Sequence, residues 1–301
     1  MERKKKGLKT SVNLIKVHQN DKKEEGNINR PNKKSKTIKD SNSSTSTSNY
    51  KYSEYLAQNE KFCDYMEDCA ISINNFNEES YRHLFCIFDG HGGNYTANLC
   101  IQKYPEIFRK CLLECPFDYE QAIKKSFLLM DKEIEKTKAQ EVGNTATVVF
   151  INNKLLYCAN VGDSSCCLIG KTAEFITTDH KCTNKNELKR IEKEGGQIID
   201  GRLGGILVVT RGLGDLDLKN KGLSAEPSVT KILINHNYDY CVIASDGVWD
   251  VLSPDEVSKI TQKHTIEDLA KIIVETAIEK GSEDNISCIV IELNKKLSTK
   301  K

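Results

Sequence analysis

Short apolar runs, separated in places by very short turns, constrain the fold of this chain more than any other feature of its sequence. A turn such as Asn152-Asn153 joins antiparallel strands, because a parallel pair needs a crossover of about a dozen residues or more. We therefore predict mostly antiparallel sheets. The predicted strands are His83–Asp89, Thr145–Ile151, Leu155–Val161, Ile206–Thr210, Tyr240–Ser245 and Ile286–Leu293.

Helical spacing of apolar residues predicts helices between these strands. Ser253, followed by Pro254 and by Glu256 at the third helical position, is typical of a helix start, and Thr265 begins a similar pattern. Gly281 is the expected stop of the last helix. The chain should therefore form an α+β domain of residues 50–295, with sheets covered by helices. The predicted helices are 94–114, 119–139, 185–194, 254–262 and 266–280.

A basic tail precedes this domain. Residues 1–40 hold thirteen Lys and Arg against five Asp and Glu, a net charge of +8, so with +1 for the whole chain residues 41–301 carry −7. Large apolar residues are rare before residue 50, too rare to offset the entropy of ordering the segment. We expect a disordered basic tail (1–49), a disordered C-terminus (296–301), and an acidic domain that does not recognise nucleic acid.

Composition also predicts the compartment. No run approaches the ~18 apolar residues of a membrane span, and the charged N-terminus lacks the apolar stretch of a secretory signal. The chain has twelve Cys, and those in predicted strands, such as Cys86 and Cys288, are typical of buried free thiols in a reducing compartment. We expect a cytoplasmic monomer that does not bind membranes. The basic clusters Arg3–Lys6 and Lys33–Lys39 are either nuclear-import or polyanion-binding signals, or simply solvated.

Acidic residues gather where the predicted strands end or begin. A single aspartate in such a place is usually a turn former or a helix cap. Antiparallel neighbours, however, bring the end of one strand beside the start of the next, so several of these residues can share one edge. The set comprises Glu67, Asp68, Asp89, Asp163, Asp246, Asp250 and Asp284.

Several carboxylates at one edge raise each other's pKa values unless cations neutralise them. Oxygen ligands select Mg²⁺ or Mn²⁺, and no C-x-x-C or H-x-x-x-H pair favours zinc. In Asp89-Gly90-His91-Gly92-Gly93 the glycines let the backbone approach an ion, and the Gly90 carbonyl is a candidate ligand. His91 titrates near neutrality, which suits a general acid, although a lone histidine is more often structural.

A series of motifs in fixed order resembles the metal-dependent serine/threonine protein phosphatases of type 2C, over about residues 60–293. Each motif alone is weak evidence, but chance does not explain all of them in family order. The motifs are Met66-Glu67-Asp68, Phe88-Asp89-Gly90-His91-Gly92-Gly93, Gly143-Asn144-Thr145-Ala146, Ala159-Asn160-Val161-Gly162-Asp163-Ser164, Asp179-His180-Lys181, Glu187, Arg190-Ile191, Gly195-Gly196, Thr210-Arg211-Gly212-Leu213-Gly214-Asp215, Ala225-Glu226-Pro227, Ser245-Asp246-Gly247-Val248-Trp249-Asp250 and Gly281-Ser282-Glu283-Asp284-Asn285.

The resemblance implies a four-layer αββα sandwich, in which two mostly antiparallel β-sheets are flanked by pairs of α-helices. It also implies two Mn²⁺ or Mg²⁺ ions at one end of the sandwich. Asp89 would bridge the two ions. Asp246 and Asp284 would complete one ion site, and Glu67 with the Gly90 carbonyl the other.

Further roles come from the same resemblance. In some family members a third ion binds at the positions of Asp163 and Asp246, while Asp68 and Asp250 match acids that hold water or neighbouring groups near the site. A hydroxide bridging the two ions would attack the phosphorus of phosphoserine or phosphothreonine in phosphoprotein substrates. His91 would protonate the departing oxygen.

The chain departs from the family pattern at two places. The family has a phosphate-binding arginine four residues before Glu67, where this chain has Cys63, and losing such charged hydrogen bonds should cost about 10- to 100-fold in rate or affinity. Lys61 is either a partial substitute, on the same face if this stretch is a strand, or a solvated side chain. The segment Leu216–Ser224 is short where the family often carries a longer flap, which affects substrate selectivity.

Three functions remain open from the sequence. The first is an active Mn²⁺- or Mg²⁺-dependent protein serine/threonine phosphatase, favoured because all expected ligands are present. The second is a pseudophosphatase or scaffold that retains the fold, for which Cys63 is the main support. The third is a metal-dependent hydrolase of another phosphoester, such as a small metabolite. Metal-dependent turnover separates the first two, and the choice of substrate separates the first from the third.

Overall fold

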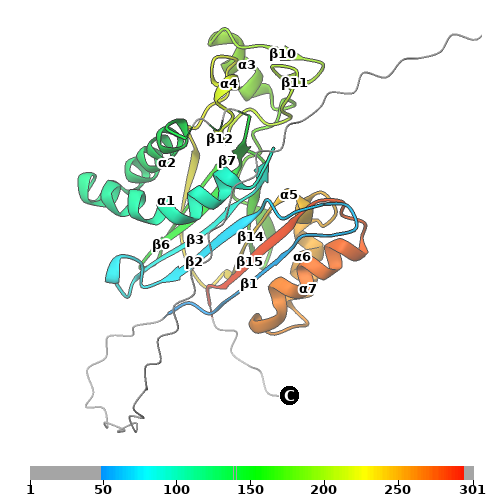
Figure 1. Ribbon diagram of the computed structural model, residues 1–301. Coiled ribbons are helices and arrows are strands. Elements are labelled where there is room, and N and C mark those ends of the chain that lie inside the picture. Colours follow the sequence, from blue (N-terminus) through cyan, green and yellow to red (C-terminus); the bar gives the residue numbers. More distant parts are fainter. Residues whose placement is uncertain (1–48, 138, 140, 295–301) are drawn as a thin grey trace, which may run out of the picture. The chain divides into compact units, whose positions relative to one another are not determined.

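Two five-stranded sheets form the centre of the domain (Figure 1). The computed structural model describes residues 49–137, 139 and 141–294. The predicted disordered tail with its basic clusters and the predicted C-terminal tail lie outside these residues, apart from Asn49. The described residues belong to a unit that extends from Ser46 to Lys301. No helix among them is long and apolar enough to cross a membrane.

All strand pairs within the two large sheets are antiparallel. The first sheet has the order β13 (Ser228–Leu233), β7 (Leu155–Val161), β6 (Ala146–Asn152), β3 (Arg82–Phe88), β2 (Cys69–Asn74). The second has the order β1 (Tyr52–Ala57), β15 (Ile286–Glu292), β14 (Tyr238–Ala244), β8 (Ser165–Gly170), β9 (Ala173–Phe175).

The alternation of side chains along the strands builds three apolar layers. In β3, Phe85 and Ile87 face the second sheet, while Leu84, Cys86 and Phe88 pack beneath helices. Helices α1 (Tyr95–Glu114) and α2 (Tyr119–Glu135) cover the first sheet, and α6 (Pro254–Thr261) and α7 (Ile266–Glu279) cover the second (Figure 1). This arrangement confirms the four-layer αββα sandwich.

Local signals set several helix ends. Ser253 and Glu256 form a reciprocal capping box at the start of α6. The sequence predicted a similar capped start at Thr265. Thr265 does precede α7, but its side chain makes no capping hydrogen bond. Gly281 follows α7 with φ +91°, a left-handed conformation that suits glycine.

The predicted strand Ile206–Thr210 is wrong. Leu207 and Val209 make only isolated bridges, because Gly204 and Gly205, at φ +59° and +78°, turn the chain just before them. Strands β1, β8 and β13 were absent from the prediction. Ile206 and Val208 are instead 61% and 47% exposed, so the alternation there marks a wall facing solvent rather than a sheet.

Residues 181–224 form an outer lobe with its own small core, at the top of Figure 1. The lobe contains α3 (Lys185–Lys193), the hairpin of β10 (Ile198–Ile199) and β11 (Arg202–Leu203), and α4 (Leu216–Lys219). Near its end, β12 (Leu213–Gly214) pairs with β5 (Gly143–Asn144), which also pairs with β4 (Gly90–His91). The lobe is therefore tied to the end of β3 through a three-stranded sheet.

A buried glutamate holds the lobe together. The Glu187 carboxylate accepts hydrogen bonds from Arg211 at 2.6 and 3.0 Å, from Arg190 at 3.0 and 3.1 Å, and from the Thr210 hydroxyl at 2.9 Å. Burial opposes ionisation, but these hydrogen bonds and the charge of Arg211 lower the pKa of Glu187 from 4.5 to about 2. Glu187 thus joins α3 to the segment that contains Thr210 and Arg211.

Replacing Glu187 by Gln should lower the free energy of unfolding by about 3 kcal/mol near neutral pH, because a carboxyl pKa lowered from 4.5 to about 2 is worth roughly that much. The folded-state pKa lies below the unfolded value, so this stabilisation is present above about pH 4.5 and is lost as the pH falls toward 2. Urea unfolding between about pH 7 and 3 measures both effects.

The matched control is Glu194→Gln, which removes an exposed partner of Arg190 and should cost less than about 1 kcal/mol. Equal losses in the two variants, or an unchanged pH dependence in Glu187→Gln, would contradict the role of the buried carboxylate.

Candidate functional site

The ends of strands from both sheets meet at one end of the sandwich. Phe88 pairs with Cys69, so Asp68 and Asp89 lie at adjacent strand ends of the first sheet. Ala244 pairs with Cys288, so Asp246 lies beside the start of β15 in the second. Between them is a cavity of about 250 Å³. Its polar lining comes from Glu67, Asp89, Gly90, His91, Thr145, Asp163, Arg202, Asp246 and Asp284.

Four of the five carboxylates that line this cavity lack positive partners. Within the described residues, no lysine, arginine or histidine forms an ion pair with Glu67, Asp89, Asp246 or Asp284. Burial, followed by the charges of Asp68 and Asp246, raises the pKa of Asp89 well above its usual value. Burial, followed by the charges of Asp163 and Asp284, raises the pKa of Asp246 to about 7. The cluster therefore requires either protons or cations.

The donors present fit hard divalent ions that keep much of their water. They are carboxylate and carbonyl oxygens, the type that Mg²⁺ and Mn²⁺ prefer. Gly90 lets its own backbone lie close to that of Glu67, since a Cβ at Gly90 would lie 2.6 Å from the Glu67 carbonyl oxygen. In the described part of the chain, however, no group of three His, Cys, Asp or Glu side chains forms a ready metal cage. Ions held here would complete their coordination with water and substrate.

Glu67 and Asp284 are held in place by nearby backbone groups. The Gly93 N–H donates to Glu67 Oε1 at 2.5 Å. Asn285 accepts from the Glu67 N–H at 2.7 Å through its side chain, and its own N–H donates to Asp284 Oδ1 at 2.7 Å. Asn285 therefore couples the two carboxylates that lie on opposite sheets.

Asp68 lies behind the cavity and does not line it. Its Oδ2 accepts a hydrogen bond from the Ser287 hydroxyl at 2.6 Å, while its buried Oδ1 has no partner. Burial raises the pKa of Asp68 to about 6, although the hydrogen bond to Ser287 opposes the shift. An unpaired buried carboxylate oxygen is costly unless a water or ion satisfies it, which supports a role for Asp68 in holding site water.

Asp163 and Asp250 share a lysine. Lys181 Nζ lies 3.2 Å from Asp163 Oδ2 and 3.9 Å from Asp250 Oδ1. Asp250 is exposed and does not line the cavity, whereas Asp163 is buried. The ammonium group already supplies positive charge where the family resemblance implied a third ion. Sequence reasoning did not identify Lys181, although it lies in the Asp179-His180-Lys181 motif.

His91 is oriented by an aspartate that sequence reasoning also missed. His91 Nε2 and Asp215 Oδ2 are 2.7 Å apart, at 30% and 5% side-chain exposure. Burial lowers the pKa of His91, but the hydrogen bond and charge of Asp215 outweigh burial and raise the net value. Gly143 must be glycine here, since a Cβ would lie 1.9 Å from Asp215 Oδ2 and 2.8 Å from His91 Nε2.

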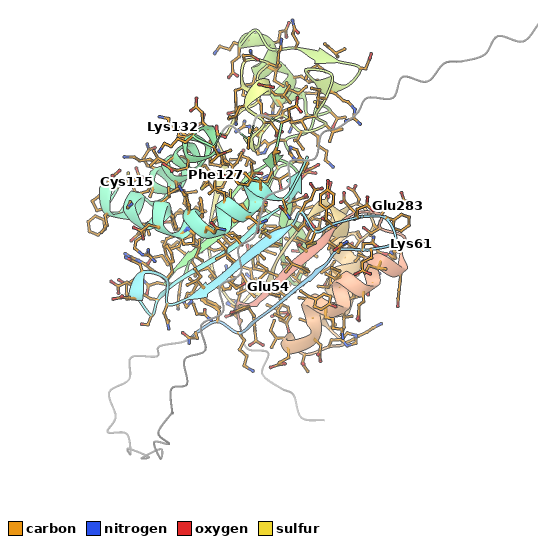
Figure 2. All side chains as sticks on the ribbon, in the orientation of Figure 1. Glu54, Lys61, Cys115, Phe127, Lys132 and Glu283 are labelled. Atoms are coloured by element: carbon orange, nitrogen blue, oxygen red, sulfur yellow. The ribbon has the colours of Figure 1, made fainter. Side chains whose placement is uncertain are left out.

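The loop between β1 and β2 does not supply a phosphate-binding cation to the cavity. Residues 60–62 form a turn, not a strand, because the Phe62 N–H bonds back to the Asn59 carbonyl at 2.9 Å. Lys61 is exposed, and its ammonium lies 4.7 Å from the centroid of the Phe62 ring. The Cys63 thiol contacts the Glu283 carbonyl at 3.6 Å. Figure 2 shows Lys61 and Glu283 at the same end of the domain.

Asp246→Asn should raise the melting temperature of the metal-free protein, because it removes one of several clustered like charges. The same change should abolish the rise in melting temperature that millimolar Mn²⁺ produces in the unaltered protein. Thermal unfolding with Mn²⁺ or with EDTA measures both. Asp250→Asn is the control, since Asp250 lies outside the cavity. An identical Mn²⁺ response in Asp246→Asn and the unaltered chain would exclude Asp246 as a ligand.

Comparison with known proteins gives consistent similarities. The family described as Protein phosphatase 2C matches residues 55–286. Protein phosphatase 2C 56 of Arabidopsis thaliana is 31% identical over 269 residues, 75% of this chain and 62% of that protein. Probable protein phosphatase 2C 27 of Oryza sativa subsp. japonica is 34% identical over 257 residues, 77% of this chain and 72% of that protein.

Solved structures show the same fold. The crystal structure of a serine-threonine phosphatase 2C from Toxoplasma gondii superimposes with a TM-score of 0.71 and 19% identity, covering 81% of this chain and 94% of that one. At this identity the likeness concerns the fold. The chain spans 62% of the length of its Arabidopsis relative, so that protein contains sequence without a counterpart here.

Proposed function

Because the chain belongs to the protein phosphatase 2C family, we propose that it is a metal-dependent protein serine/threonine phosphatase that acts on phosphoproteins. One observation carries the proposal: four carboxylates without positive partners, from both sheets, line one cavity beside a histidine that an aspartate positions. A site for an apolar ligand would not retain such a cluster, because like charges gathered at one place repel one another.

Asp89, Asp246 and Asp284, with Glu67 and the Gly90 carbonyl, are the residues that would hold two Mn²⁺ or Mg²⁺ ions. When bound, two such ions lower the pKa of a shared water and neutralise phosphoryl oxygens. The protein's own contribution is geometric, because Asn285 and Gly93 fix the carboxylates before substrate arrives. We propose two ions rather than three, because Lys181 already neutralises Asp163.

His91 is proposed as the general acid. Its imidazole lies on the cavity wall, and the hydrogen bond that Nε2 donates to the Asp215 carboxylate fixes the ring and favours the protonated form. A protonated His91 can donate to the serine or threonine oxygen as it leaves phosphorus. With this proton the serine or threonine leaves as an alcohol rather than as an alkoxide, which is a poor leaving group. The proposed reaction forms no covalent intermediate on the protein.

A binding protein with a phosphatase fold is the second candidate, favoured by Cys63 alone. A thiol in contact with the Glu283 carbonyl cannot form the charged, forked contact with phosphate that arginine forms. Every carboxylate expected to hold the two ions nevertheless lines the cavity. Turnover distinguishes the two candidates directly.

The full chain should hydrolyse a phosphothreonine peptide only when Mn²⁺ or Mg²⁺ is present, and EDTA should abolish the reaction. Asp246→Ala should reduce kcat/KM by at least about 100-fold, because it removes one ion ligand. Phosphate release is the measurement, and a small phosphorylated metabolite is the comparison substrate. A folded, Mn²⁺-binding chain without turnover would support the binding protein. Preference for the metabolite would indicate a different phosphoester hydrolase.

Asp215→Asn and Gly143→Ala should each lower kcat by about 10- to 100-fold, with little change in the Mn²⁺-induced melting shift. The first removes the charge that orients His91, and the second inserts a Cβ between His91 and Asp215. Both should be less harmful for an aryl phosphate, whose leaving group needs no proton. An equal loss with aryl and peptide substrates would contradict the acid role. Gly195→Ala, a glycine with φ +74° and open space around it, controls for a glycine substitution.

A further inference from the structure

We propose that Arg202 binds the phosphate group of the substrate, in place of the arginine that the family carries at the position of Cys63. The inference rests on the proposed function and names the residue that holds the phosphate in that same site. Arg202 lies on β11 in the outer lobe and lines the same cavity as Glu67, which comes from the β1–β2 loop.

Charge in the cavity makes a further cation necessary. Five carboxylates line it, but Lys181 pairs with Asp163, so four remain without a positive partner, and two divalent ions would offset those four. A phosphate monoester brings close to two more negative charges, for which a further cation is needed. Of the side chains that line the cavity in the described residues, Arg202 alone carries a permanent positive charge, since His91 is engaged with Asp215.

The other cations near the site are unsuitable. Lys181 is held between Asp163 and Asp250, and Lys61 lies against the ring of Phe62 outside the cavity. Burial, followed by the charges of Asp284 and Glu67, raises the pKa of the Cys63 thiol, so it stays neutral and attracts no anion.

One hydrogen bond positions the Arg202 guanidinium and leaves most of its N–H groups available. Its Nη1 donates to the Ile206 carbonyl at 2.7 Å, which fixes the guanidinium across the tight turn at Gly204 and Gly205. Across the described ranges, the Arg202 guanidinium makes no other hydrogen bond and no ion pair with a carboxylate. Four N–H groups are therefore free, and a guanidinium presents them in a fork that matches two phosphate oxygens.

The fold holds this arginine at the cavity. Ile199 pairs with Arg202 across the β10–β11 hairpin, and the neighbouring Leu203 is buried in the lobe core. Glu187 anchors Arg211 at the end of the same segment. The lobe therefore supplies a positive charge to the cavity that the β1–β2 loop, with Cys63, does not supply.

The test compares Arg202→Gln and Arg202→Lys in the full chain with Mn²⁺. Arg202→Gln should raise KM for a phosphothreonine peptide and the inhibition constant of inorganic phosphate by about 10- to 100-fold, with a smaller effect on kcat. Arg202→Lys should be intermediate, because it keeps charge but loses the fork. Arg109→Gln, an exposed arginine paired with Glu106 on α1, is the matched control and should change neither constant.

Cys63→Arg added to Arg202→Gln should restore much of the lost phosphate affinity. A melting temperature and Mn²⁺ response equal to the unaltered chain establish that the variants are folded. Unchanged KM and phosphate inhibition in Arg202→Gln would overturn the inference, as would a larger effect of Lys61→Gln. Neither result affects the proposed function, which Asp246→Ala tests. If the unaltered chain has no turnover, calorimetry with inorganic phosphate and Mn²⁺ decides the inference, since equal affinity in Arg202→Gln overturns it.

Discussion

Repulsion among clustered carboxylates at one end of the sandwich is the constraint on which the rest of the site depends. Antiparallel register brings the end of β3 beside the start of β2, and the end of β14 beside the start of β15. Acidic residues at those ends then share a cavity whose burial raises the pKa values of Asp89 and Asp246. A fold that retains such an unfavourable cluster gains from it only when cations neutralise the charge.

Around this cluster, the other charged side chains have specific partners. Lys181 neutralises Asp163, Asp215 raises the pKa of His91 at the cavity wall, and Glu187 joins Arg190 to Arg211 in the lobe. Each of these pairs has a specific counter-charge, whereas the central carboxylates have none. The contrast separates the groups that stabilise the fold from those that await a ligand, and it leaves the unpaired guanidinium of Arg202 among the latter.

Sequence patterns predicted the regular elements best where burial is continuous. β7 was predicted with its observed bounds, and the capping box of Ser253 is present as predicted. The edge strand β13 was missed because its side chains are only partly buried, so its apolar pattern is weak. The expected strand at Ile206–Thr210 failed because alternation on an exposed wall looks the same as alternation in a sheet. For Lys61 the sequence left two alternatives, and the turn at Asn59 favours the solvated side chain, because this stretch is not a strand.

The sequence by itself determined the family, the layer order and the identity of the acidic residues, because strand periodicity and motif order are local properties of the chain. Only the tertiary structure decided which cation each acid meets. Asp215 lies 124 positions from His91, and Lys181 meets both Asp163 and Asp250. Such pairings depend on sheet register and on the path of the outer lobe, which bring together residues far apart in the chain. For the same reason, the sequence showed Cys63 as a departure from the family pattern, while only the folded chain shows that Arg202 lines the cavity.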